Sequence, residues 1–254
     1  MTAAAMLVGL ALASPARAET TVPGCVTPPD LIRLANPLQR IAKKIAAAEP
    51  ITIVAIGSSS TSGAGASSPA ANYPSRLAVE LERHFPKVPI TIVNRGVGGE
   101  EIGDMLNRFD SAVIAEKPDL VLWQLGTNSV IRGHMLGVHD VLIRAGLAKI
   151  RATGADIILI DPQFAPKVIS KPEAERMVTL ISATAKRENV DLFRRFEVMR
   201  HWRDVDHIGF ETFVSPDGLH MNDWSYACMA KGLGDAIAEA AQRPILSATA
   251  RPAR

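Results

Sequence analysis

Short apolar runs separated by helix-length amphipathic segments set the strongest limit on the fold of this chain. Four runs are rich in β-branched residues and a weaker fifth follows them: ITIVAI (51–56), PITIVN (89–94), DLVLWQL (119–125), ADIILID (155–161) and VDLF (190–193). Continuous apolar runs of this length are typical of strands buried on both faces of a parallel sheet. The sequence therefore predicts an α/β fold, a three-layer sandwich with a central, mostly parallel sheet of about five strands.

The segments between these runs place apolar residues at helical spacing. In YPSRLAVELERHF, for example, Leu77, Leu81 and Phe85 would share one helix face. Helices are expected over residues 37–49, 73–85, 101–116, 135–152, 172–188 and 222–242. A chain of 254 residues with 47% hydrophobic and 21% charged residues is ordinary for one large globular domain, so disordered and fibrous classes are excluded.

The two ends of the chain differ from its centre. An apolar stretch too short to span a bilayer is followed by Ala16-Arg17-Ala18, a pattern typical of an export signal, although no Lys or Arg precedes the stretch and an apolar terminal helix is the alternative. The predicted organisation is an export signal over 1–18, an extension with one helix over 19–48, the main domain over 49–243 and a flexible tail over 244–254. Export predicts a periplasmic or secreted protein whose mature chain begins near Glu19.

Charge and cysteine content indicate which kinds of partner and which cellular compartment are compatible with the sequence. Lys plus Arg number 28 and Asp plus Glu 26, and no dense basic stripe is interleaved with aromatic residues, so no nucleic-acid partner is expected. No later apolar run is long enough for a membrane helix, so no stable membrane insertion is expected after signal cleavage. In an oxidising compartment Cys25 and Cys228 could form a disulfide; two unrelated buried thiols are an equally good interpretation.

Polar and glycine-rich turns follow three of the predicted strands. They are GSSST (57–61), NRGVGGE (94–100) and GTNS (126–129), and SPDGLH (215–220) precedes the last predicted helix. Ligands of parallel sheets bind where the carboxyl ends of the strands meet, so these turns are expected to lie together. They supply a serine, backbone N–H donors, a side-chain amide and an acid–histidine pair, which is the set that acyl transfer to a serine needs.

The roles follow from the chemistry of each group. A serine hydroxyl is a weak nucleophile, so a histidine must take its proton and an acid must orient the ring. The D-x-x-H spacing lets Asp217 and His220 meet from one turn. Gly99 would let a backbone N–H approach a tetrahedral oxyanion, and Asn128 would offer an uncharged amide donor.

Over roughly residues 50–240 these turns resemble, in order and in strand context, the blocks of the SGNH/GDSL hydrolase family. That family carries a Gly-Asp-Ser nucleophile turn, an N-x-G-x-x-G turn, a G-x-N-D turn and a D-x-x-H pair. The resemblance implies the flavodoxin-like SGNH fold for residues 49–243. The family pattern F-G-D-S-L-T lies over IGSSST (56–61), which implies that Ser59 is the nucleophile.

The same resemblance implies the rest of the site. Asp217 and His220 would complete the triad, and Gly99 and Asn128 would form the oxyanion hole with the Ser59 N–H. Two positions depart from the family. Ser58 stands where Asp is usual, and Ser129 stands where Asp commonly follows the Asn, so hydroxyl hydrogen bonds are expected to replace two carboxylates.

Other candidate sites are weaker. SGAGASS and GVGGEE lack the third glycine of a dinucleotide-binding loop, and the histidines at 134, 139, 201 and 207 have no metal-ligand spacing, so no cofactor and no metal are expected. RHWRDVDHIGFETFVSPDG (200–218) is predicted to be a long polar loop that leads to Asp217. Trp202 in this loop is a candidate for stacking on a sugar, and structural packing is the alternative.

The N-terminal signal pattern and the family resemblance together imply an exported serine esterase that acts without a cofactor on a small-molecule or glycan ester. Short acyl groups, such as acetyl on carbohydrate, are favoured over long-chain lipids. Two alternatives remain open: an O-acyltransferase acting on a periplasmic or extracellular glycan, and a catalytically silent polysaccharide-binding module.

Overall fold

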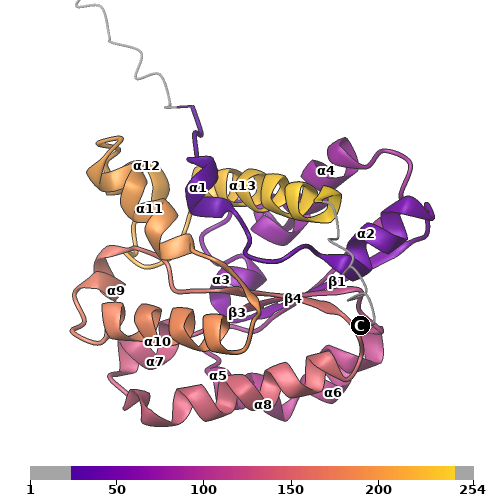
Figure 1. The fold of residues 1–254 in the computed structure, drawn as a ribbon. Helices are drawn as coiled ribbons and strands as arrows, with labels where there is room; N and C mark the ends of the chain where they lie inside the picture. The colour runs from indigo at the N-terminus through magenta and orange to yellow at the C-terminus, as the bar shows by residue number, and fades with distance from the viewer. Residues whose placement is uncertain (1–23, 244–254) are drawn as a thin grey trace, which may run out of the picture.

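A single parallel sheet organises the structure, a computed structural model that describes residues 24–243 (Figure 1). The predicted export signal (1–18) and tail (244–254) lie outside the described residues. The strand order is β2-β1-β3-β4-β5, and every neighbouring pair is parallel. The strands are β1 (Ile51–Gly57), β2 (Ile90–Gly96), β3 (Leu120–Gln124), β4 (Asp156–Ile160) and β5 (Asp191–Phe193). All five predicted strands are present, within two residues of their expected bounds, and the predicted fold class is confirmed.

Helices cover both faces of this sheet (Figure 1). On one face lie α2 (Gln39–Ala46), α4 (Tyr73–His84) and α13 (Asp223–Gln242); on the other lie α5 (Ile102–Asn107), α6 (Phe109–Ala112), α8 (His139–Arg151) and α10 (Ala174–Arg187). The remaining helices are α1 (Pro29–Ile32), α3 (Ser59–Ser62), α7 (Thr127–Arg132), α9 (Pro166–Ile169), α11 (Arg195–Asp204) and α12 (Phe210–Phe213), and 3₁₀ turns span Pro69–Ala71, Ile114–Glu116 and Leu136–Val138.

Strand register brings the polar turns to one edge of the sheet. Gly57 at the end of β1 pairs with Gly96 at the end of β2, and Ile56 pairs with Trp123 of β3. After β1 the chain goes to one side for β2 and then crosses to the other side for β3. The turns after β1 and β3 therefore diverge at the point where parallel sheets of this type bind ligands.

The sequence of the closing helix α13 explains both where the helix begins and how closely it packs against α4. The Asn222 side chain accepts hydrogen bonds from the backbone N–H groups of Trp224 and Ser225, which caps the helix. Small residues then let α13 lie close against α4: a Cβ added at Gly234 would stand 3.0 Å from the Glu80 side chain. The start of α13 thereby fixes the end of the preceding Asp217–His220 loop.

Two segments differ from the sequence-based expectation. The helix expected over 101–116 is divided at Arg108, whose guanidinium binds the Glu100 carboxylate and the Arg95 carbonyl and so fixes the chain there. The long polar loop expected over 200–218 is wrong, because it contains the end of α11 and all of α12. Trp202 and Phe213 in this segment are buried and Phe210 packs against the core, although most of the other residues there are polar or charged.

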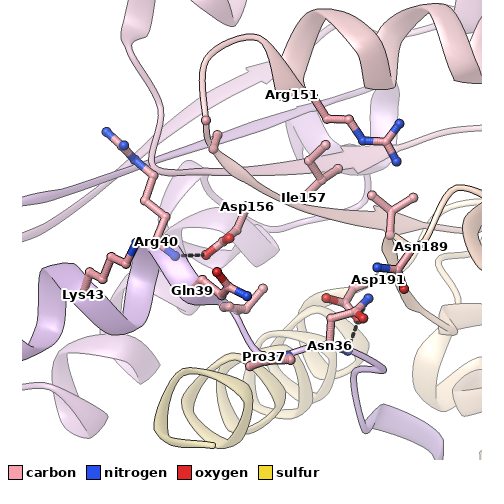
Figure 2. Close-up of a pocket in the computed structure, with 14 residues that line it drawn as sticks. Asn36, Pro37, Gln39, Arg40, Lys43, Arg151, Asp156, Ile157, Asn189 and Asp191 are labelled. Atoms are coloured by element: carbon pink, nitrogen blue, oxygen red, sulfur yellow. Dashed lines mark hydrogen bonds between the residues drawn. The ribbon is translucent and has the colours of Figure 1, made fainter. Parts of the chain in front are cut away.

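The N-terminal extension contains two helices, α1 and α2, rather than the one expected, because Pro29–Ile32 forms a further short turn. Carboxylates at the amino ends of β4 and β5 hold it. Asp156 accepts the N–H groups of Arg40 and Ile41, and Asp191 accepts the N–H of Asn36 (Figure 2). Burial raises the pKa of both carboxyl groups. A cavity of about 360 Å³ lies beside these contacts, at the end of the sheet opposite the polar turns.

The structure joins Cys25 to Cys228, with Cα atoms 5.4 Å apart and a sequence separation of 203. Restricting so long a loop in the unfolded chain stabilises the fold by roughly 5 kcal/mol in the chain-entropy model. We expect reduction, or Cys25→Ser, to lower the thermal unfolding midpoint on the order of 10 °C. The check is calorimetry with and without reductant, together with intact mass after thiol alkylation. Two alkylated thiols in unreduced protein would rule the bond out.

Candidate active site

Of the three consecutive serines after β1, Ser59 alone reaches the surface. Ser58 and Ser60 are 2% and 1% exposed, whereas Ser59 is partly exposed and begins helix α3. Its Oγ lies 2.9 Å from Nε2 of His220. The backbone N–H of Ser59 belongs to the first turn of a helix, where N–H groups have no intrahelical acceptor and are available to an anion.

The loop before α13 presents His220 and Asp217 to this serine. Nδ1 of His220 lies 2.5 Å from Oδ2 of Asp217. With the ring proton on Nδ1, the imidazole donates to the carboxylate and keeps Nε2 as an acceptor for the Ser59 hydroxyl. Oδ1 of Asp217 accepts the backbone N–H groups of Leu219 and His220, at 2.9 and 3.0 Å. Burial acts to raise the pKa of Asp217, but these hydrogen bonds and the His220 ring outweigh it and lower the pKa to about 2.

A buried glutamine holds the nucleophile turn from below. Oε1 of Gln124, the last residue of β3, accepts the backbone N–H of Ser58 at 2.9 Å and its hydroxyl at 3.1 Å, and the Thr61 hydroxyl at 3.3 Å. The hydroxyl of Ser58 thus makes a neutral hydrogen bond where the family usually has a carboxylate. Gln124 is 0% exposed, so its side chain acts on the turn and not on a ligand.

The glycine turn after β2 lies beside the serine. A Cβ added at Gly98 would stand 3.9 Å from Cβ of Ser59, and Gly99 has a left-handed backbone with φ +81° that favours glycine. Nδ2 of Asn128, at the start of α7, donates to the Glu100 carbonyl at 2.8 Å. An amide nitrogen carries two N–H groups, so the second can serve an oxyanion. The glycine turn thus lies next to Ser59 at Gly98 and is bonded to Asn128 at Glu100.

A cluster of charged side chains around Glu101 joins the glycine turn after β2 to helix α7. Glu101 accepts the hydroxyl of Ser129 at 2.7 Å and also binds Arg132 and His134. Burial acts to raise the pKa of Glu101, but these contacts lower it to about 2. Arg132 in addition donates to the Gly99 carbonyl at 2.8 Å. A carboxylate from another loop thus meets the Ser129 hydroxyl, which stands where the family commonly has Asp.

The proposed sugar contact of Trp202 is wrong. Its side chain is 1% exposed and packs edge-on against Phe213 and Trp224, with ring centroids 5.7 and 5.1 Å apart. A ring enclosed in this way cannot stack on a ligand, so its role is packing. Trp123 is likewise buried, in the sheet core against Phe109.

Sequence reasoning missed the polar residues beneath the site. In the sequence Gln124 stands within an apolar run, and Gln163 and Arg195 belong to no recognised motif, although both follow strand ends. Gln163 follows the fourth apolar run, and three other runs are followed by polar turns of the site, so its position could have identified it as a candidate.

Within residues 24–243, no group of three His, Cys, Asp or Glu side chains is placed to hold a metal ion. Over the same span, no helix is both long and apolar enough to cross a membrane.

Comparison with known proteins gives a family and two sequence relatives. The family model of the non-GDSL lipase-like family matches residues 24–243. An acetylxylan esterase from Geobacillus stearothermophilus is 30% identical over 94 residues, covering 33% of this chain and 43% of that protein. An arylesterase from Vibrio mimicus is 25% identical over 150 residues, covering 59% of this chain and 70% of that protein. The chain thus spans less than half the length of the acetylxylan esterase.

Among solved structures, the chain is similar to a two-domain esterase active on acetylated mannans. The TM-score is 0.71 at 19% sequence identity, over 87% of this chain and 58% of that chain. Such a likeness at low identity supports the three-layer fold.

Proposed function

The chain belongs to the non-GDSL lipase-like family, which confirms the resemblance to SGNH/GDSL-type esterases, and on this basis we propose that it is a serine esterase acting on acyl esters. The observation that carries the proposal is the hydrogen-bonded chain from Ser59 Oγ through His220 to Asp217 at the carboxyl edge of the sheet. A catalytically silent binding module has no need of this alignment.

We infer the mechanism from this geometry. His220 Nε2 takes the proton of the Ser59 hydroxyl as Oγ attacks the ester carbonyl, and Asp217 stabilises the imidazolium that forms. The carbonyl oxygen becomes an oxyanion, which the N–H groups of Ser59 and Gly99 and the Asn128 amide would stabilise. His220 then gives its proton to the leaving alcohol, and the acyl group stays on Ser59. Water, deprotonated by His220, attacks this acyl-enzyme and releases the acid, and the serine regains its proton.

We further propose that the substrate is a short acyl ester on carbohydrate, such as acetyl on a glycan. The acetylxylan esterase relative and the esterase active on acetylated mannans support this class. The proposal includes export to an oxidising periplasmic or extracellular compartment, which the Cys25–Cys228 bond supports because such bonds persist in oxidising surroundings.

The test compares acetate release from acetylated xylan and mannan fragments with hydrolysis of short-chain and long-chain nitrophenyl esters. We expect turnover of the acetylated fragments and of short-chain esters, and little of long-chain esters. Preference for long chains would contradict the substrate class. Appearance of an acylated product only when a glycan acceptor is added would identify a transferase, and absence of fluorophosphonate labelling would identify a silent module.

A further inference from the structure

Gln163 lies beneath the active site and contacts three segments at once. It follows β4 and is 1% exposed. Oε1 accepts the Thr127 hydroxyl at 2.9 Å and Nη2 of Arg195 at 3.0 Å, and Nε2 donates to the Leu219 carbonyl at 3.2 Å. Its amide is therefore bonded on both sides, inside the protein.

Arg195 fixes which way this amide faces. Its side chain is 0% exposed, and Nε donates to the backbone carbonyl of Asp161 at 2.9 Å. Burial lowers the pKa of Arg195, and the nearby Asp161 carboxylate opposes that effect; this carboxylate itself accepts the Phe196 N–H. A guanidinium can only donate, as does the Thr127 hydroxyl here, so both must meet Oε1 of Gln163. The amide nitrogen is then left to face Leu219.

The two segments joined in this way carry the two halves of the proposed chemistry. Leu219 lies between Asp217 and His220, and Thr127 precedes Asn128. We propose that Gln163 is a positioning residue that sets the general base His220 relative to the oxyanion donor Asn128, with Arg195 orienting its amide. This inference rests on the proposed esterase function. Gln163 touches no reacting atom and acts through the backbone of the loop and the start of α7.

Two substitutions of Gln163 distinguish a positioning role from a contribution to core stability alone. Gln163→Met keeps the volume and removes every hydrogen bond. Gln163→Glu keeps an acceptor for Thr127 and gives Arg195 a charged partner, but a carboxylate cannot donate to the Leu219 carbonyl and places an acceptor against it. The Glu variant is therefore expected to fold while losing the contact to the His220 loop.

Thr184→Val is the matched control. Thr184 in α10 is also 1% exposed, and its hydroxyl donates to Asp140 at 2.7 Å, so the substitution removes a buried hydrogen bond outside the proposed site. The measurements for all three variants are kcat, KM, the rate of fluorophosphonate labelling and the thermal unfolding midpoint.

We expect Gln163→Met and Gln163→Glu each to lower kcat by at least about tenfold, because small displacements of catalytic groups are costly, with KM little changed. Labelling should slow in parallel, since it also needs His220. Thr184→Val should keep kcat within about twofold whatever its unfolding midpoint. Full kcat in Gln163→Glu, or a loss of kcat in Thr184→Val equal to that in Gln163→Met, would overturn the inference. Persistent turnover in Ser59→Ala would instead overturn the esterase mechanism, so the two failures are distinguishable.

Discussion

Ser59→Ala should abolish ester turnover, with a loss in kcat on the order of 10⁶. The reason is that Ser59 carries the hydroxyl 2.9 Å from His220, whereas the hydroxyls of Ser58 and Ser60 are buried and cannot reach a substrate. Ser58→Ala and Ser60→Ala are the matched controls and should keep much of the activity. Ser58→Ala removes one hydrogen bond to Gln124 but leaves the backbone N–H bond to the same oxygen.

The measurement is kcat for the three variants, with circular dichroism to establish folding. Mass spectrometry of the fluorophosphonate-labelled peptide identifies the modified serine independently of any activity loss. A label on Ser58 or Ser60, or a loss of turnover confined to one of those positions, would show that the nucleophile is assigned wrongly.

His220→Ala and Asn128→Ala should fail in different ways, because the two residues act on different parts of the same step. Without His220 the serine keeps its proton, so both ester turnover and probe labelling should be lost. Asn128 is proposed to stabilise charge that develops later, and removing one oxyanion donor costs about 10²–10³ in kcat, or ~3–4 kcal/mol. Its KM should hardly change, because a donor aimed at the oxyanion contributes mainly in the transition state.

Labelling rates separate these two variants. Asn128→Ala should be labelled slowly but detectably, since Ser59, His220 and the backbone donors remain. Its side chain also holds the Glu100 carbonyl, so circular dichroism and the unfolding midpoint serve as the control for a displaced turn. If Asn128→Ala keeps near-normal kcat, or raises KM alone, Asn128 is a brace of the turn and not an oxyanion donor.

The strands could be predicted because each lies in a short run rich in apolar or β-branched residues. Burial explains these runs for β1, β3 and β4, which are almost wholly buried, whereas β2 at the edge of the sheet is only partly buried. Helix ends were less predictable. The break at Arg108 depends on its ion pair with Glu100, and α11 depends on aromatic packing of Trp202 against α12 and α13, neither of which a window of neighbouring residues contains.

The candidate site shows the same division. Ser59 and Asn128 stand in short motifs after strands, and the Asp217–His220 pair stands in a short motif before the last helix, so the sequence indicated them. Gln163 and Arg195 act through partners 32 to 56 positions away, and their residue types form no local pattern. Only the folded arrangement shows that a polar side chain in the core supports a distant loop.

The groups that bond the nucleophile turn to the core are also uncharged. Ser58, Thr61 and Gln124 supply hydroxyls and an amide, and Tyr73, which shares a hydrogen bond with Thr61, stays neutral because burial raises its pKa to about 12. A carboxylate in place of Ser58 would add a group that is protonated in acid. The hydrogen bonds that join this turn to Gln124 therefore do not depend on the ionisation of any side chain.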